Sequence, residues 1–180
     1  MERYRIVPRV SVYFVTFTVV EWLPVFIEEQ ACKIITDSLN FCVRNKCLRV
    51  NGYVIMPTHL HAILFDADFQ AERLKHTLDD MRKFTGRQLL EYSAKHRPKS
   101  FTETFRESAG KDRERRFWQP TRHPVGITSE GFWKQKMDYL HDNPCRKGLV
   151  LAPENWRFSS ARYWAARQEN DVQLSDVGWD

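Results

Sequence analysis

The densest runs of β-branched and aromatic residues predict three strands. The first covers residues 12–20, with the sequence Val-Tyr-Phe-Val-Thr-Phe-Thr-Val-Val. The second covers residues 48–56 and ends at Pro57-Thr58, and the third follows at once over residues 59–65. The short break between the last two favours a tight antiparallel connection. A fourth, shorter strand or extended segment is expected at 124–127.

Apolar positions that recur at close to 3.6 residues predict three helices. The first spans about 28–46 and the second 71 to about 95. The third spans about 129–141, with Thr128 or Ser129 as its N-cap and Asn143-Pro144 closing it. The charged stretch 95–116 is predicted to be a mobile basic loop, and an irregular C-terminal segment begins near residue 148.

The expected order β-α-β-β-α-β-α places the chain in the α+β class. It fits a ferredoxin-like (RRM-like) layout, in which one antiparallel sheet carries helices mostly on one face. We expect one catalytic domain over 1–150. We expect residues 151–180 to form a C-terminal extension that packs on this domain or trails from it.

Composition narrows the possible environments and partners. A hydrophobic content of 42% over 180 residues argues against a disordered chain. No apolar run approaches the roughly 20 residues of a membrane helix, and no signal-peptide core follows the first charges, so we expect a cytoplasmic protein. The four cysteines form no C-x-x-C pair, which argues against a zinc knuckle. The net charge of +5 favours a polyanionic partner.

The pattern His59-Leu60-His61 provides the first candidate chemistry. Residues two apart on a strand point to the same face, so both imidazoles can reach one ion while Leu60 turns into the core. Imidazole binds Mn²⁺ or Zn²⁺ well, and it binds Mg²⁺ when oxygen ligands complete the shell. Taken alone, the pattern equally describes two half-exposed strand histidines without a metal.

Tyr139 and Asn143 provide the second candidate chemistry. If the helix reaches Asn143, the two residues share a face one turn apart. Asn143 offers a carboxamide oxygen, which suits Mg²⁺ or Mn²⁺, and Tyr139 offers a hydroxyl nucleophile on a rigid element. Taken alone, Tyr139 also fits ordinary packing with one hydrogen bond.

Together the four residues predict a metal-assisted attack of tyrosine on a phosphodiester. A divalent ion held by two histidines and one amide keeps positions for phosphate oxygens, and a nearby tyrosine can form a covalent phosphotyrosine. The general base is not identified, since His141 and Asp142 are close to Tyr139 only in sequence.

The stretches that carry these residues resemble a known family. Residues 52–64, Gly-Tyr-Val-Ile-Met-Pro-Thr-His-Leu-His-Ala-Ile-Leu, resemble the His-hydrophobe-His motif of the small single-tyrosine transposases. Residues 137–150, Met-Asp-Tyr-Leu-His-Asp-Asn-Pro-Cys-Arg-Lys-Gly-Leu-Val, resemble their nucleophile helix. Residues 116–120 and 155–163 are similar to further segments, so the resemblance spans roughly residues 10 to 165 in the correct order.

The resemblance implies a ferredoxin-like fold, Mg²⁺ or Mn²⁺ as cofactor, and a 5′-phosphotyrosine intermediate on single-stranded DNA. It assigns Tyr139 as nucleophile and His59, His61 and Asn143 as metal ligands. Insertion-sequence members commonly have glutamine at the third ligand position. Asparagine there, with the extended C-terminal segment, is similar to the branch associated with repetitive extragenic palindromes, which acts on hairpin-forming repeats. Thr58 replaces the Asn or Glu of many relatives, which leaves the metal affinity open.

The resemblance also bears on the partner and the assembly. It favours a monomer over a homodimer and a bacterial, nucleoid-associated location. Arg116, Arg146 and Lys147 are expected to contact the DNA backbone, and Trp118 is a candidate for stacking on bases, although core packing is its commoner use. Two alternatives stay open: a single-stranded nucleic-acid-binding protein that does not cleave, and a metallonuclease that uses water.

Overall fold

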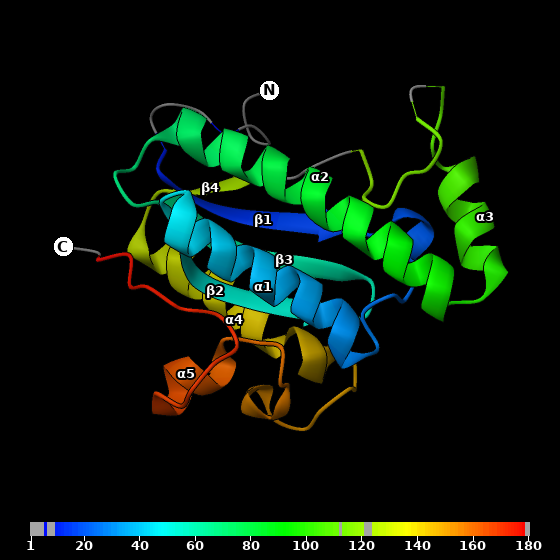
Figure 1. Cartoon of the computed structure of the whole chain (residues 1–180). Helices are drawn as coiled ribbons and strands as arrows, with labels where there is room; N and C mark the ends of the chain where they lie inside the picture. The colour runs from blue at the N-terminus through cyan, green and yellow to red at the C-terminus, as the bar shows by residue number, and fades with distance from the viewer. Residues whose placement is uncertain (1–5, 7–9, 112, 121–123, 179–180) are drawn as a thin grey trace.

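The computed structural model describes residues 6, 10–111, 113–120 and 124–178. Figure 1 shows a sheet with two long helices across one face. The elements in chain order are β1 Val12–Thr18, the 3-10 helix η1 Val20–Trp22, α1 Glu29–Asn45, β2 Leu48–Met56, β3 His59–Asp66, α2 Ala71–His96, α3 Lys99–Glu107, β4 Val125–Ile127, α4 Glu130–Arg146, η2 Pro153–Asn155 and α5 Ala161–Ala166.

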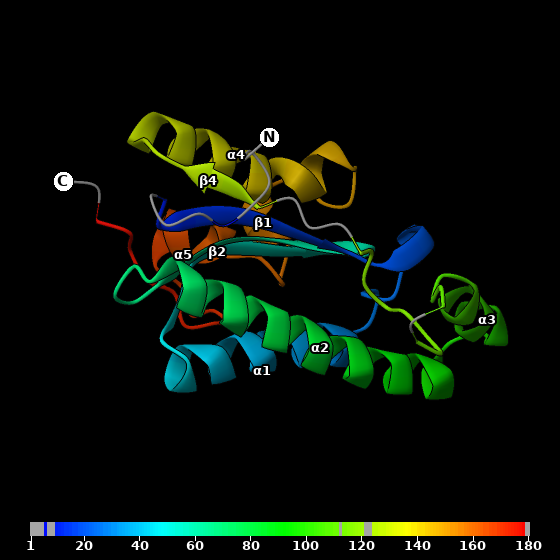
Figure 2. The same ribbon diagram turned by 90° about the horizontal axis from the view of Figure 1, so that it is seen from above.

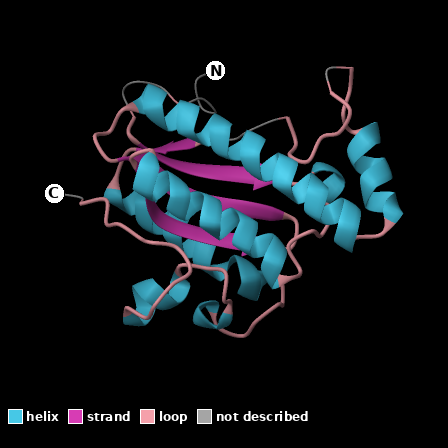
Figure 3. Ribbon diagram, viewed as in Figure 1, coloured by secondary structure: helices cyan, strands magenta, loops and turns pink. Residues whose placement is uncertain are grey.

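The four strands pair antiparallel in the order β2-β3-β1-β4. This is the order of the expected βαββαβ layout, so the α+β class and the antiparallel sheet are confirmed. Strands β2 and β3 follow each other through the Pro57-Thr58 turn, as the short break predicts. The helices and strands lie in three layers, which Figure 2 shows from above, and Figure 3 distinguishes helices from strands by colour.

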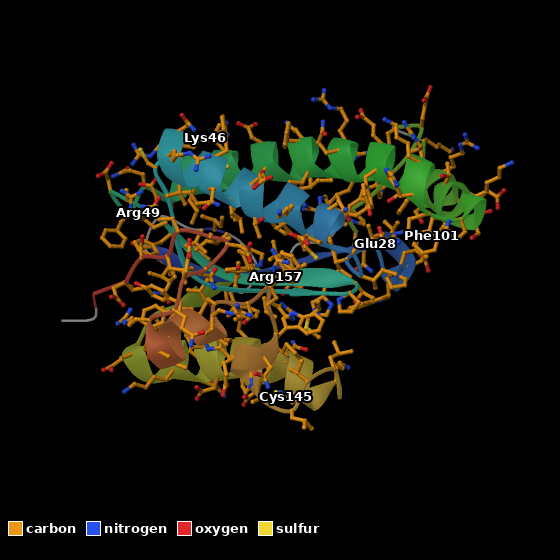
Figure 4. All side chains as sticks on the ribbon, turned by 60° about the horizontal axis from the view of Figure 1, so that its bottom comes forward. Glu28, Lys46, Arg49, Phe101, Cys145 and Arg157 are labelled. Atoms are coloured by element: carbon orange, nitrogen blue, oxygen red, sulfur yellow. The ribbon has the colours of Figure 1, made fainter. Side chains whose placement is uncertain are left out.

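The two faces of the sheet have separate cores, because side chains alternate along each strand. Tyr13, Val15 and Phe17 of β1 pack with Leu60 of β3 in the larger core under α1 and α2. The smaller core lies under α4 and contains the alternate residues of the same strands. The expectation that the helices lie mostly on one face therefore holds for α1 and α2, while α4 covers the other face (Figure 2). Figure 4 shows the same separation, with Lys46 at the end of α1 and Cys145 on α4 on opposite sides of the sheet.

Two local predictions are wrong. The stretch 95–116 is not a loop throughout, because α2 continues to His96 and α3 spans Lys99–Glu107. The short helix is anchored by Phe105, which is buried, and its ring lies 5.5 Å from the ring of Phe117. One or two aromatic anchors in a charged segment produce little periodicity, which is why the pattern was not visible in the sequence.

Pro144 does not close the third predicted helix, because α4 continues through it to Arg146. A proline in the last turn costs only one backbone hydrogen bond, and the carbonyl groups beyond it find partners. Gly148 takes a left-handed φ of 69°, and Leu149 N donates to the Pro144 carbonyl at 2.9 Å. These contacts form a Schellman motif, and Asn143 therefore lies inside the helix, one turn after Tyr139.

The C-terminal segment packs along the outer edge of β2. Ile55 N donates to the Phe158 carbonyl and Ser160 N donates to the Tyr53 carbonyl, both at 2.9 Å. Further along the strand, Ser175 N donates to the Val50 carbonyl at 2.9 Å. Within the described ranges, no helix is long and apolar enough to cross a membrane.

Candidate active site

His59 and His61 lie side by side on the face of β3 that α4 covers. The register pairs His61 with Thr16 and His59 with Thr18 of β1. Their ring centroids are 4.5 Å apart, and the residues are only 8% and 6% exposed. Leu60 points into the opposite core, as the alternation predicts.

A threonine hydroxyl holds each histidine through the same ring nitrogen. Thr16 Oγ1 is hydrogen-bonded to His61 Nδ1 at 2.8 Å, and Thr58 Oγ1 to His59 Nδ1 at 2.9 Å. These bonds orient the rings and leave Nε2 of each histidine as the nitrogen for a further ligand. Thr58 thus has the same role for His59 that Thr16 has for His61.

Burial keeps both imidazoles neutral. Desolvation, with a smaller contribution from the charge of Lys147, lowers the pKa of His59 to about 4. Desolvation also lowers the pKa of His61 to about 3, with a second contribution from His59. At neutral pH both rings therefore keep the free lone pair that a metal ligand requires.

Tyr139 stands at the edge of this histidine pair. Its ring centroid lies 5.6 Å from that of His61 and 5.9 Å from that of Phe14. The residue is 39% exposed, so solvent and ligands can reach it. Two cations flank the ring: Lys136 Nζ lies 5.8 Å and Arg146 Cζ 5.4 Å from its centroid.

Asn143 completes the set that the sequence analysis brought together. It is 6% exposed and lies between Tyr139, which contacts His61, and Lys147, whose charge acts on His59. One helical turn separates Asn143 from each of them, so Asn143 shares their face of α4. Among the described residues, no protein group hydrogen-bonds this carboxamide.

The donor set fits a divalent cation that accepts both nitrogen and oxygen ligands. Two neutral imidazoles and one amide oxygen match Mg²⁺ or Mn²⁺ with open positions for further oxygens. Over the described ranges, no group of three or more His, Cys, Asp and Glu side chains is arranged to hold a metal ion.

Arg146 and Lys147 lie close to this centre, as expected from their positions after Tyr139. Two other candidates do not. Trp118 is 6% exposed, its Nε1 donates to Thr85 Oγ1 at 3.2 Å, and its ring packs against Phe26. The suggestion that Trp118 stacks on bases is therefore wrong, because the residue belongs to the larger core.

Arg116 lies beside Trp118 on the far side of β1 from the histidines. Its NH2 donates to the Ala109 carbonyl at 3.1 Å, and its backbone N–H donates to the Phe105 carbonyl at 2.8 Å. The residue lines a separate surface pocket next to α2. Any contact of Arg116 with a ligand therefore takes place away from Tyr139.

Two residues at the centre were not selected from the sequence. Lys136 precedes Tyr139 by three positions, a spacing that places both on one helix face. Trp22 is exposed, has a left-handed φ of 53°, and its ring lies 5.8 Å from that of His59. No signal in the sequence points to Trp22, because β1 ends before it and its neighbour Glu21 also has a positive φ.

His141 faces away from Tyr139 although it is close to it in sequence. Its Nε2 lies 2.8 Å from Ser160 Oγ, and desolvation lowers its pKa to about 4. Ser160 Oγ in turn accepts from the Tyr53 backbone N–H at 3.0 Å. His141 therefore connects α4 to β2 and the C-terminal segment and does not serve the tyrosine.

The fold and this centre define an antiparallel α+β protein with a candidate metal and tyrosine site. None of the protein-family models compared with the sequence matches it, and no curated protein matches it in sequence. Among solved structures, the chain is similar to a REP-associated tyrosine transposase bound to a REP hairpin, with a TM-score of 0.55 and 17% sequence identity. The match covers 94% of this chain and 88% of that one, so the two share the fold over nearly their whole length.

Proposed function

We propose that the protein is a single-stranded DNA endonuclease and strand transferase that forms a 5′-phosphotyrosine at Tyr139. The observation that supports this most is the contact between the accessible Tyr139 ring and a buried, neutral histidine pair. A tyrosine kept for packing would not need two threonine-oriented imidazoles beside it.

His59, His61 and Asn143 would hold the ion, Mg²⁺ or Mn²⁺. When bound, the ion supplies positive charge that polarises the scissile phosphodiester and offsets charge on its oxygens. Thr16 and Thr58 fix the ring orientation through Nδ1, so both Nε2 atoms are preorganised for this task.

The protein's own groups perform the transfer. The Tyr139 hydroxyl attacks phosphorus and gives its proton to water or a base, a bond from oxygen to phosphorus forms, and the bond to the sugar 3′-oxygen breaks. The 3′-oxygen takes up a proton and leaves as a hydroxyl, and attack by a 3′-hydroxyl reverses the step. Lys136 and Arg146 offset negative charge on the phosphoryl group, since both lie over the Tyr139 ring.

The substrate proposal draws on the structural neighbour, which is a transposase bound to a hairpin. We place the cleavage at or near hairpin-forming repeats in single-stranded DNA, in the bacterial cytoplasm at the nucleoid. The net charge of +5 supports a polyanionic partner. A monomer is sufficient, because one chain contributes all four residues of the centre.

A denaturing gel tests the proposal. Purified protein is incubated with labelled single-stranded hairpin DNA and Mg²⁺ or Mn²⁺. We expect a metal-dependent band of protein covalently joined to DNA, absent in Tyr139→Phe. The matched control is Tyr163→Phe on α5, because Tyr163 also lies under a guanidinium, that of Arg167 at 4.9 Å, but outside the centre.

Two outcomes would replace the proposal. Cleavage that persists in Tyr139→Phe without an adduct would identify a metallonuclease that uses water. Binding to several hairpins without any cleavage would identify a single-stranded nucleic-acid-binding protein.

A further inference from the structure

A pocket lies on the other side of β1 from Tyr139, between α2 and the segment 113–120. Its volume is about 650 Å³, large enough for a nucleotide-sized group. Of its twelve lining residues six are cationic and one, Asp79, is acidic. The cationic residues are Arg82, Lys83, Arg87, Arg113, Arg115 and Arg116.

The wall of this pocket is held closely against α2. Gly86 lies under Trp118, and a Cβ at that position would meet Trp118 Cδ1 at 3.3 Å. Trp118 Nε1 also donates to Thr85 Oγ1, and Arg82 NH2 donates to the Gln119 carbonyl at 2.5 Å. The absence of a side chain at Gly86 thus allows the segment to approach the helix, and the pocket is a built part of the fold.

Three of its cations have no carboxylate partner among the described residues. Lys83, Arg87 and Arg115 form no ion pair there, whereas Arg82, Arg113 and Arg116 interact with neighbouring groups. Elsewhere on the surface, lysines pair with nearby acids, as Lys33 does with Glu29 and Lys75 with Glu72. The pocket therefore concentrates positive charge, with six cations against one acid among its lining residues.

The pocket and the Tyr139 centre are connected through the end of β1. Gln119 N donates to the Thr18 carbonyl at 2.8 Å, and Val20 N donates to the Phe117 carbonyl at 2.9 Å. On one face of β1, Arg82 lies 5.2 Å from the Phe17 ring centroid, and on the other face Thr16 holds His61. Residues 113–120 thus lie between α2 and the end of β1.

We propose that this pocket, defined by Lys83, Arg87 and Arg115, binds the phosphodiester backbone of the DNA at a distance from the cut. The inference deepens the proposed function and rests on DNA being the partner. Guanidinium groups match phosphate oxygens in geometry and charge, and the excess of cations disfavours ligands without several negative charges. The backbone can belong to the paired stem of a hairpin or to the unpaired strand beside it.

The test is the salt dependence of DNA binding in the triple variant Lys83→Gln, Arg87→Gln, Arg115→Gln. Binding is measured in a Tyr139→Phe background with a hairpin carrying a single-stranded tail, with the blunt duplex, and with the single strand. If three phosphates lose their partners, the fall in affinity between about 50 and about 200 mM salt becomes smaller than in the parent, by about 40-fold on duplex DNA and about 20-fold on single-stranded DNA. A matched control, Lys33→Gln, Arg44→Gln, Lys75→Gln, removes the same charge from exposed positions on α1 and α2.

The pattern across the three DNAs decides the source of the backbone. If the triple variant shows a shallower salt dependence on the hairpin and the duplex, the pocket binds the paired stem. If it shows a shallower salt dependence on the single strand, the pocket binds the unpaired segment. A slope equal to that of the control on every DNA overturns the proposal. The covalent adduct in the wild-type background is scored separately. If the triple variant shows a shallower salt dependence but the wild type forms no adduct, the pocket is retained and the tyrosine chemistry is rejected. If the wild type forms an adduct but the salt dependence of the triple variant is unchanged, the tyrosine chemistry is retained and the pocket is rejected.

Discussion

Lowering the pH from about 7 to about 5 is expected to destabilise the protein through His141, which lies outside the metal set. Burial lowers the pKa of His141 from 6.5 to about 4 in the folded protein. Below pH 6.5 the unfolded chain takes up a proton at this position, while the folded protein does not until about pH 4. The stability that His141 contributes is thus complete above its unfolded pKa and is lost as the pH falls toward its folded pKa.

The size of the effect follows from the same two pKa values. One pKa unit corresponds to about 1.4 kcal/mol, so the full loss is roughly 3 kcal/mol, of which about 2 kcal/mol falls between pH 7 and pH 5. This is a large fraction of the 5–15 kcal/mol, roughly, that stabilises a typical domain. His59 and His61 act in the same direction, so the contribution of His141 has to be separated by substitution.

The assay is urea unfolding at the two pH values, without divalent metal, for wild type and His141→Gln. Glutamine is neutral at both pH values and can still bond to Ser160 Oγ. We expect the wild type to lose about 2 kcal/mol more than His141→Gln between the two conditions. His76→Gln, which removes an exposed histidine from α2, should behave as the wild type. Equal losses in wild type and His141→Gln would refute the assignment of a buried, neutral His141.

Two further predictions concern the support of the centre. Thr16→Val removes the hydroxyl that holds His61 Nδ1, and we expect Mn²⁺ affinity measured by calorimetry to fall about 10- to 100-fold. Thr18→Val, on the same strand face, should leave it unchanged, and equal effects would contradict the role of Thr16. Gly52→Ala would bring a Cβ to 2.6 Å from Met137 Sδ between β2 and α4, so we expect a loss of about 1–3 kcal/mol in chemical unfolding. Gly131→Ala, which meets open space on α4, should cost nothing, and the reverse order would count against this packing.

The sheet could be predicted because its sequence signals are local. Residues 12–18, 48–56 and 59–66 combine β-branched and aromatic side chains, and the alternation in His59-Leu60-His61 correctly separated the two faces. The spacing of Tyr139 and Asn143 likewise placed both on one helix face. These are the cases in which the period of the element itself determines which side chains meet.

The remaining features depend on contacts between segments that are distant in sequence. Nothing near Trp118 in the chain reveals that Phe17 and Thr85 bury it, which is why the sequence admits this residue as a candidate DNA contact. The cations of α2 and those of 113–116 lie far apart in the sequence, and only the close approach at Gly86 joins them in one pocket. Trp22 was missed for the same reason, since its left-handed backbone and its contact with His59 arise from the turn after β1.

The C-terminal segment along β2, residues 158–175, affects whether copies of the protein can pair through this edge of the sheet. A bare edge strand offers unpaired N–H and C=O groups to any other strand, and Tyr53-Val54-Ile55-Met56 combines the apolar residues that favour such pairing. Here the groups of Val50, Tyr53 and Ile55 are engaged by residues 158–175 of the same chain. The C-terminal segment therefore prevents β2 from pairing with a strand of another copy, and so disfavours aggregation through this edge. Cutting the chain near residue 150 would expose the edge again.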